Sequence, residues 1–390
     1  MLLVMLLNAS CSKNGSSPSN NQSNNIITAL TIIPGYTDTT GTLKALTASY
    51  FTNMGMAVTY GPMLGNVSYL ATVKTNANIV TFGNELKEGS IVKNDGSYDY
   101  ATADALYNIC ANNGLQVYGH TLVWHSQQNV TYLKGLITAA GTAQAATVID
   151  AEMKRYITTT INHYANKIRA WDVVNEVISD NNGVMRSDAN TTVSAANANS
   201  VFLYGQYLGT KYDQNNYVLK AFQYARLADP TVLRFINDYN LDYSRVKTDS
   251  LVALVSFINK NGAALVDGIG TQMHISINSN KDNIDYSFQA LAATGLKIRI
   301  SEMDIVTNTT KASGFTPDAT ALAAQAAMYK YVIQSYLKNV PFAQRYGITV
   351  WGVADTDSWL NSTASPDVPL LFDKNYAKKS TFSGFKQGLQ

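Results

Sequence analysis

The chain has 390 residues, of which 46% are hydrophobic, enough for one large domain or two small ones. Its 29 Lys and Arg residues against 27 Asp and Glu residues give a net charge of only +2, with no Lys/Arg-rich run, which argues against a nucleic-acid partner. The two cysteines, Cys11 and Cys110, cannot build a disulfide scaffold, and neither has a second Cys or a His at metal-ligand spacing.

The first 25 residues read as an export and tether segment. An apolar run at 1–7, too short to span a bilayer, is followed by small residues and then Cys11. This order resembles a bacterial lipoprotein signal, which implies that Cys11 is lipidated; a plain secretory signal is the alternative. Residues 12–25 form a Ser/Asn/Gly linker too polar to pack a core. We predict an export segment at 1–11 and a single domain over 26–390.

These features predict an exported protein. We expect it at the bacterial outer membrane or cell surface, or in the periplasm, with a lipid on Cys11 as its only contact with a membrane. Secretion into the medium is the alternative. We also expect a monomer.

Short apolar runs alternate with longer amphipathic patterns along the rest of the chain. The predicted strands are 55–58, 78–82, 115–120, 168–175, 232–237, 266–274, 296–302 and 346–352. Helical spacing is clearest around 153–164, 251–258, 217–228 and 319–338. Eight strands alternating with helices predict a single-domain α/β protein with a (β/α)8 TIM barrel. A doubly wound sheet, the alternative, usually carries a glycine-rich phosphate loop after its first strand, and the sequence has no such pattern.

Polar and aromatic side chains follow nearly every predicted strand, at the rim where a (β/α)8 barrel does its chemistry. In chain order they are Asn84, Lys87, His120, Trp124, Asn175, Glu176, Tyr239, Gln272, His274, Glu302, Trp351 and Trp359. A purely structural protein has no reason to bring so many such groups to one rim.

Two of these residues, Glu176 and Glu302, place a carboxylate at the end of an apolar strand. By strict alternation Ile298, Ile300 and Glu302 share one strand face. A partly desolvated carboxylate costs free energy unless it is paired or used, and a structural ion pair is the alternative at each site. Two such groups at one barrel mouth favour acetal hydrolysis, which needs a proton for the departing oxygen and an electron pair for the anomeric carbon.

Six motifs occur in order along the chain: GHTLVWHSQ at 119–127, WDVVNE at 171–176, NDYN at 237–240, DGIGTQMH at 267–274, SEMD at 301–304 and WGVAD at 351–355. Together they resemble the motifs of glycoside hydrolase family 10, the retaining endo-β-1,4-xylanases. The resemblance implies that the substrate is xylan or a related β-1,4-linked polysaccharide, and it implies no cofactor.

The resemblance also implies a role for each site residue. Glu176 would be the acid/base and Glu302 the nucleophile, while Asn175 would hold the sugar 2-hydroxyl. His274 would hydrogen-bond Glu302 and be oriented by Asp304. Asn84, Lys87, His120, Gln272, Trp351 and Trp359 would line the sugar sites on the non-reducing side, Trp124 would pack beneath the reactive sugar, and Tyr239 would lie close to the cleft.

Three histidines, His120, His125 and His274, follow different predicted strands. No third-ligand pattern stands beside them, so we expect no metal.

Two positions depart from the family pattern. Gly83 stands where the family usually has a Glu that grips a sugar, which predicts a weaker or differently shaped neighbouring subsite. Leu360 stands where the family tends to have Arg. Two other functions remain open: a β-1,4-glucanase or cellulase on a related barrel, and a non-catalytic surface lipoprotein that captures glycans. The second of these predicts that one catalytic carboxylate is missing.

Overall fold

The computed structural model describes residues 32–180, 182–187 and 201–390. The predicted export segment, the linker and Cys11 lie outside these residues. In the described part of the chain, no helix has the length and apolar character to cross a membrane.

Eight parallel strands close into a barrel. They are β1 (Asn53–Val58), β2 (Ile79–Phe82), β3 (Gln116–Trp124), β4 (Ile168–Asn175), β5 (Leu233–Asp238), β6 (Gly268–Thr271), β8 (Lys297–Val306) and β9 (Arg345–Val350). Each strand pairs with the next, β6 pairs with β8, and β9 pairs with β1, so the ring has no free edge. The predicted (β/α)8 barrel is confirmed.

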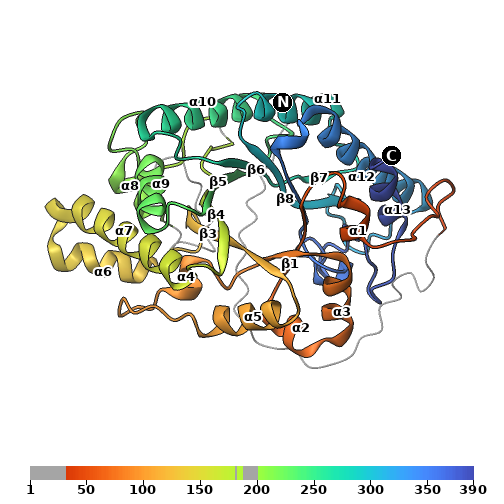
Figure 1. Cartoon of the computed structure of the whole chain (residues 1–390), viewed down its shortest axis with the longest axis horizontal. Coiled ribbons are helices and arrows are strands. Elements are labelled where there is room, and N and C mark those ends of the chain that lie inside the picture. Colours follow the sequence, from red (N-terminus) through yellow and green to blue (C-terminus); the bar gives the residue numbers. More distant parts are fainter. Residues whose placement is uncertain (1–31, 181, 188–200) are drawn as a thin grey trace.

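Helices surround this ring of strands (Figure 1). They are α1 (Leu43–Thr47), α2 (Tyr60–Gly65), α3 (Val67–Asn76), α4 (Glu88–Ile91), α5 (Ala101–Asn112), α6 (Val130–Ala140), α7 (Ala145–His163), α8 (Leu203–Leu208), α9 (Tyr217–Ala228), α10 (Arg245–Gly262), α11 (Lys281–Ala292), α12 (Ala319–Asn339) and α13 (Ser380–Gly388). Their ends follow local chemistry. The side chain of Asn216 caps the first turn of α9, for example, and Pro230 follows its end.

Two predicted strands differ from the structure. The third continues past His120 to Trp124, so His120 lies within β3 rather than after it. The predicted strand 266–274 is two strands, β6 and the short β7 (His274–Ser276), because Met273 between them adopts a left-handed conformation with φ of 58°. Strand β7 pairs only with β8 and turns His274 toward Asp304.

The barrel interior is filled in layers. At its amino end, Tyr118, Phe235 and Tyr346 from three different strands pack edge to face, with ring centroids 4.8–5.9 Å apart. Above them the buried Arg299 guanidinium donates to Thr81 and Thr349 and lies 3.8 Å from Asp172. A close approach is required at Gly119, where an added Cβ would lie 2.1 Å from the Trp171 ring.

Strict alternation breaks down near the end of β8. Ile298 and Ile300 belong to the core between barrel and helices, while Arg299 and Ser301 point inward. Continued alternation would send Glu302 outward as well, but the register against β9 shifts between Ile300 and Met303. This irregularity turns Glu302 into the barrel mouth, where it meets Asn237. The shared face expected for Ile298, Ile300 and Glu302 is therefore not observed.

Candidate active site

Glu302 is held at the barrel mouth by donors on two sides. Its side chain is almost fully buried, at 5% exposed. Oε1 accepts a hydrogen bond from Nδ2 of Asn237 at 2.8 Å, and Oε2 lies 3.3 Å from Nε2 of His274. Nδ1 of His274 lies 2.9 Å from Oδ2 of Asp304. The three side chains form a carboxylate–imidazole–carboxylate chain, with the contacts that the sequence resemblance implies.

The surroundings favour the charged forms of Glu302 and His274. Burial alone would raise the pKa of Glu302, but the His274 hydrogen bond, the electrostatic influence of the His120 and His274 rings and the Asn237 hydrogen bond hold it at about 2. Burial likewise opposes protonation of His274, yet Asp304 and Glu302 raise the pKa of its imidazole well above the ordinary value. The arrangement therefore presents an ionised Glu302 beside an imidazolium at neutral pH.

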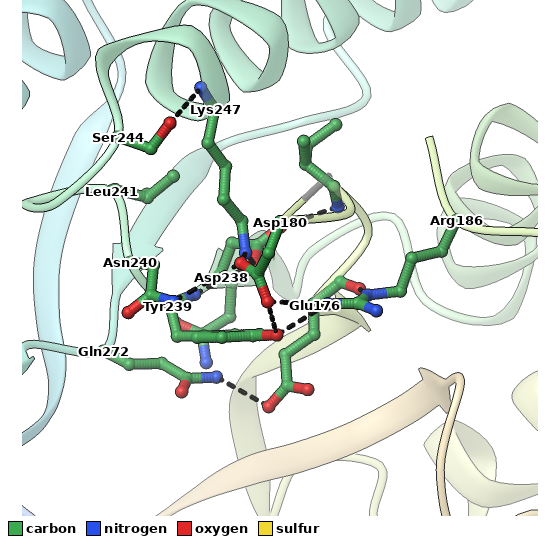
Figure 2. Close-up of polar contacts among 12 residues, drawn as sticks. Glu176, Asp180, Arg186, Asp238, Tyr239, Asn240, Leu241, Ser244, Lys247 and Gln272 are labelled. Atoms are coloured by element: carbon green, nitrogen blue, oxygen red, sulfur yellow. Dashed lines mark hydrogen bonds and ion pairs between the residues drawn. The ribbon is translucent and has the colours of Figure 1, made fainter. Parts of the chain in front are cut away.

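Glu176 follows directly after β4 in a left-handed conformation with φ of 56°. A non-glycine residue there carries strain on the order of 1–3 kcal/mol and needs support from its surroundings. The Glu176 amide donates to the Asn237 carbonyl at 2.7 Å, and the Glu176 carbonyl accepts from Nε of Arg186 at 2.9 Å. Its carboxylate accepts from Nε2 of Gln272, the contact drawn as a dashed line in Figure 2, with a length of 3.1 Å.

A chain of amide side chains joins the two carboxylates. Gln272 donates both to Glu176 and to Oδ1 of Asn175, the second contact being 3.2 Å long. Asn237 donates to the same Asn175 oxygen at 2.9 Å and to Glu302. Glu176 and Glu302 therefore belong to one continuous site, although they lie 126 positions apart in the chain.

His125 approaches the other oxygen of Glu176. Its Nδ1 lies 3.7 Å from Oε2 of Glu176 and has no hydrogen-bond partner within the described residues. Burial, with help from the charges of Arg186 and Lys247, lowers the pKa of His125 well below its ordinary value. His125 is therefore a neutral neighbour of Glu176 at neutral pH.

Asn84, Lys87 and Trp124 form one group of the predicted rim residues. Lys87 lies just after Asn84, with its ammonium 3.3 Å from Oδ1 of Asn84 and 4.8 Å from the centre of the Trp124 ring. The Lys87 side chain is buried, whereas Asn84 is exposed. A cation packed against an aromatic face places a polar group beside a flat apolar surface, a combination that suits a sugar ring.

His120 and Trp351 form a second group. Nδ1 of His120 lies 2.8 Å from Oδ2 of Asp172, and the Trp351 ring meets the rings of His120 and His274 edge to face at 5.5 and 6.3 Å. The contact with Asp172 fixes the orientation of the His120 ring beside Trp351.

Trp359 and Tyr239 have protein partners that the sequence did not predict. Nε1 of Trp359 donates to Oδ2 of Asp304 at 3.0 Å, and its side chain is still 40% exposed. The Tyr239 hydroxyl donates to Asp180 and accepts from Arg186 at 2.6 Å. Arg186 therefore links Tyr239 to Glu176, because it donates to the Tyr239 hydroxyl and to the Glu176 carbonyl.

Three residues of the site were given no role from the sequence. Asn237 and Asp172 lie within quoted motifs, and both are buried polar residues of barrel strands. Arg186 lies in no quoted motif, and its link to the Glu176 carbonyl depends on the fold alone. Across the described ranges, no three His, Cys, Asp or Glu side chains cluster in a way that could hold a metal ion.

The chain is similar to several known proteins. A family model described as glycosyl hydrolase family 10 matches residues 42–387. The endo-β-1,4-xylanase Xyn10C of Cellvibrio japonicus is 31% identical over 344 residues, which cover 84% of this chain and 53% of that protein. The exoglucanase XynX of Acetivibrio thermocellus is 31% identical over 366 residues, covering 92% of this chain and 30% of that protein.

A similar solved structure is a mutant of xylanase 10C from Cellvibrio japonicus in complex with xylopentaose. It has a TM-score of 0.77 and 31% identity, over 90% of this chain and 69% of that one. The chain spans about half the length of the Xyn10C protein that it matches. With the family model covering most of its length, and the two carboxylates joined at one barrel mouth, the chain belongs to glycosyl hydrolase family 10.

Proposed function

We propose that the chain is an endo-1,4-β-xylanase that cleaves internal β-1,4-xylosidic bonds with retention of configuration. Glu302 attacks the anomeric carbon while Glu176 gives its proton to the departing glycosidic oxygen. Glu176 then takes a proton from water as that water breaks the bond between the sugar and Glu302. The two carboxylates suffice for this chemistry, and we propose no cofactor.

One observation carries the proposal: the two carboxylates have different partners. Glu302 is bound by an imidazolium and an amide, which keep it ionised and fit a nucleophile. Glu176 is contacted instead by the Gln272 amide and faces a neutral histidine, surroundings that differ from those of Glu302. Two carboxyl groups in unlike surroundings are what an acid/base and nucleophile pair requires.

The surrounding residues support a β-1,4-linked sugar chain as the substrate. Asn175 presents its amide between Glu176 and Glu302, the position proposed for contact with the sugar 2-hydroxyl. We propose that Asn84, Lys87, His120, Gln272, Trp351 and Trp359 line the sugar sites on the non-reducing side. Trp124 would lie beneath the reactive sugar. A related xylanase binds xylopentaose, which agrees with this assignment.

The test is hydrolysis of arabinoxylan and glucuronoxylan by the purified protein, with identification of product lengths. We expect internal cleavage to short oligosaccharides. Glu302→Ala should lose hydrolysis while polysaccharide binding is retained. Equal hydrolysis by the wild type and Glu302→Ala would refute the proposed function.

A β-1,4-glucanase is the second candidate, favoured by one relative that is named an exoglucanase. Initial rates on xylan and on carboxymethyl cellulose separate the two, and we expect the rate on xylan to be higher. A non-catalytic glycan-capturing lipoprotein requires the loss of one carboxylate, and both are present at the barrel mouth.

We further propose that the protein is exported as a monomer and tethered by a lipid on Cys11. The apolar run, the small residues before Cys11 and the polar linker after it support export and the lipid on Cys11. Labelling of cells with a tritiated fatty acid should mark the wild type and leave Cys11→Ser unmarked. Label on both proteins would refute attachment at Cys11.

A further inference from the structure

Four charged side chains and one tyrosine form a cluster next to Glu176 (Figure 2). We call it the Lys247 cluster, and its members are Asp180, Arg186, Asp238, Tyr239 and Lys247. They come from the segment after β4, the end of β5 and the first turn of α10. The proposed reaction assigns no role to its charges.

Lys247 is the most constrained member. It is 1% exposed, and its Nζ lies 2.8 Å from Oδ1 of Asp180, 3.1 Å from Oδ1 of Asp238 and 3.6 Å from the centre of the Tyr239 ring. It is also the third residue of α10, where the helix dipole disfavours a cation. A buried ammonium in that position persists only because two carboxylates compensate it.

The cluster is bonded to the backbone that carries Glu176. Arg186, whose Nη2 donates to the Tyr239 hydroxyl, donates through Nε to the Glu176 carbonyl. Oδ2 of Asp238 accepts from the amide of Ile178 at 2.9 Å. The left-handed conformation of Glu176 is therefore fixed from two sides by groups that Lys247 holds together.

The charges of the cluster balance. The formal charges are +2 for Arg186 and Lys247 and −2 for Asp180 and Asp238, a sum of zero beside Glu176. Burial raises the pKa of Asp238, and the charges of Lys247 and Arg186 oppose this rise. Burial opposes ionisation of Asp180, but Lys247, Tyr239 and Arg186 outweigh it and lower its pKa. Loss of either sign of charge would leave one uncompensated charge near a carboxyl group that must gain and lose a proton.

We propose that Lys247 is a positioning residue for catalysis, which through Asp180, Asp238 and Arg186 sets both the backbone geometry and the proton affinity of the acid/base Glu176. The inference rests on the proposed function, in which Glu176 must be protonated for the first step. Extra negative charge near Glu176 stabilises its protonated form, and extra positive charge stabilises its ionised form.

Other ionisable groups face the same region and stay unchanged in the test. His125 approaches Glu176 from the end of β3, and Glu302 belongs to β8 across the site. Asp242 lies buried before α10, where burial raises its pKa to about 6. None of these is altered by the substitutions below.

The experiment is the pH dependence of kcat/KM on an aryl β-xylobioside with a poor leaving group. Lys247→Met keeps the apolar stem and removes the positive charge, so its alkaline limb should move to higher pH. Asp180→Asn keeps the shape and removes a negative charge, so its limb should move to lower pH. We expect each shift to be about half a pH unit, and the double variant should return close to the wild type.

Two controls separate charge from folding. Lys247→Arg retains the charge and should keep the wild-type limb. Lys220→Met breaks an ion pair of similar length to Asp150, 2.6 Å long and between α9 and α7, and should leave the limb in place. Structural damage alone would lower kcat/KM. It would not move the alkaline limb to higher pH in Lys247→Met and to lower pH in Asp180→Asn.

The outcomes are distinct. An inactive wild type would refute the proposed function itself. An active wild type whose alkaline limb is unchanged in either single variant, or moves the same way in both, would overturn the role of Lys247.

Discussion

Nε2 of His274 lies 3.3 Å from Oε2 of Glu302, so the proposed nucleophile is bound directly by an imidazole. The opposite ring nitrogen faces Asp304, which fixes the orientation of the ring and favours its protonated form. An ionised Glu302 and a protonated His274 stabilise each other, and both side chains are largely buried, at 6% and 18% exposed.

Replacement of His274 should change the pH range of activity. His274→Gln keeps an amide donor near the position of Nε2 but carries no charge. The pKa of Glu302 is held at about 2, and its ordinary value is 4.5. Without the His274 charge, the midpoint of the acidic limb of kcat/KM should therefore move to higher pH by about two units.

A suitable control for His274→Gln is His163→Gln, since His163 also meets a carboxylate, that of Asp104, at 2.8 Å, on a helix away from the site. The control should keep the wild-type limb. An unchanged acidic limb in His274→Gln would show that His274 does not hold Glu302 ionised.

The same carboxylate predicts how stability depends on pH. Because folding lowers the pKa of Glu302, this carboxylate stabilises the folded state. Its contribution to the unfolding free energy is complete above pH 4.5 and is lost as the pH falls toward about 2. In urea titrations, the unfolding free energy of the wild type should fall more steeply over this interval than that of Glu302→Gln. Parallel curves would contradict the stabilised carboxylate.

The N–H group of Trp359 should contribute to the stability of the fold, in addition to the contribution of its ring. Trp359→Phe keeps an aromatic surface but removes the donor to the buried Asp304. Hydrogen bonds to charged groups contribute roughly 1.5–3 kcal/mol, so the unfolding free energy should fall by about that amount. Urea denaturation measures it, and an unchanged midpoint would mean that the indole hydrogen bond is dispensable.

Much of this site could be predicted from the sequence because barrel strands deliver their ends to one rim. Glu176 follows an apolar strand, and the alternation of strands and helices predicted where that strand ends. The sequence also predicted that Glu302 lies at this rim. Its inward direction, however, comes from the register shift in β8, which the alternation of side chains along a strand does not predict. Local irregularities of this kind leave no periodic signal.

The Lys247 cluster lay beyond prediction for a different reason. Asp180, Arg186 and Lys247 belong to segments whose mutual approach is set by tertiary packing, and nothing in their spacing indicates which charges pair. The split between β6 and β7 was missed as well, because the left-handed backbone of Met273 has no side-chain signature.

Loss of the acid/base should depend on the leaving group. Glu176→Ala should lower kcat/KM by about 10²- to 10⁴-fold on an aryl glycoside with a poor leaving group, which needs the proton. The loss should be much smaller on a dinitrophenyl glycoside, whose leaving group departs without one. Equal losses on both substrates would make the assignment of Glu176 wrong.

Gly83 offers a test of the predicted weak subsite. An added Cβ would lie 3.1 Å from Cγ2 of Thr59, so a side chain fits after a small movement. Glu85 cannot substitute, since its carboxylate accepts from the amides of Tyr60 and Asn84. Gly83→Glu should tighten binding of short xylo-oligosaccharides by roughly tenfold, the value of one charge-assisted hydrogen bond. Gly83→Ala, the matched control, should not.

Calorimetric titration of short xylo-oligosaccharides gives these affinities. Equal affinity in the wild type and Gly83→Glu would show that the subsite lacks nothing at this position.

The central claim is that Glu302 forms a covalent bond to the sugar. The most direct measurement is peptide mass mapping after incubation with a 2-deoxy-2-fluoro β-xylobioside carrying a good leaving group, since the fluorine slows breakdown of the intermediate. The account predicts one added fluoroxylobiosyl group on the peptide that contains Glu302. Label on a different carboxylate, or turnover that leaves the β-linked substrate as an α-configured product, would contradict it.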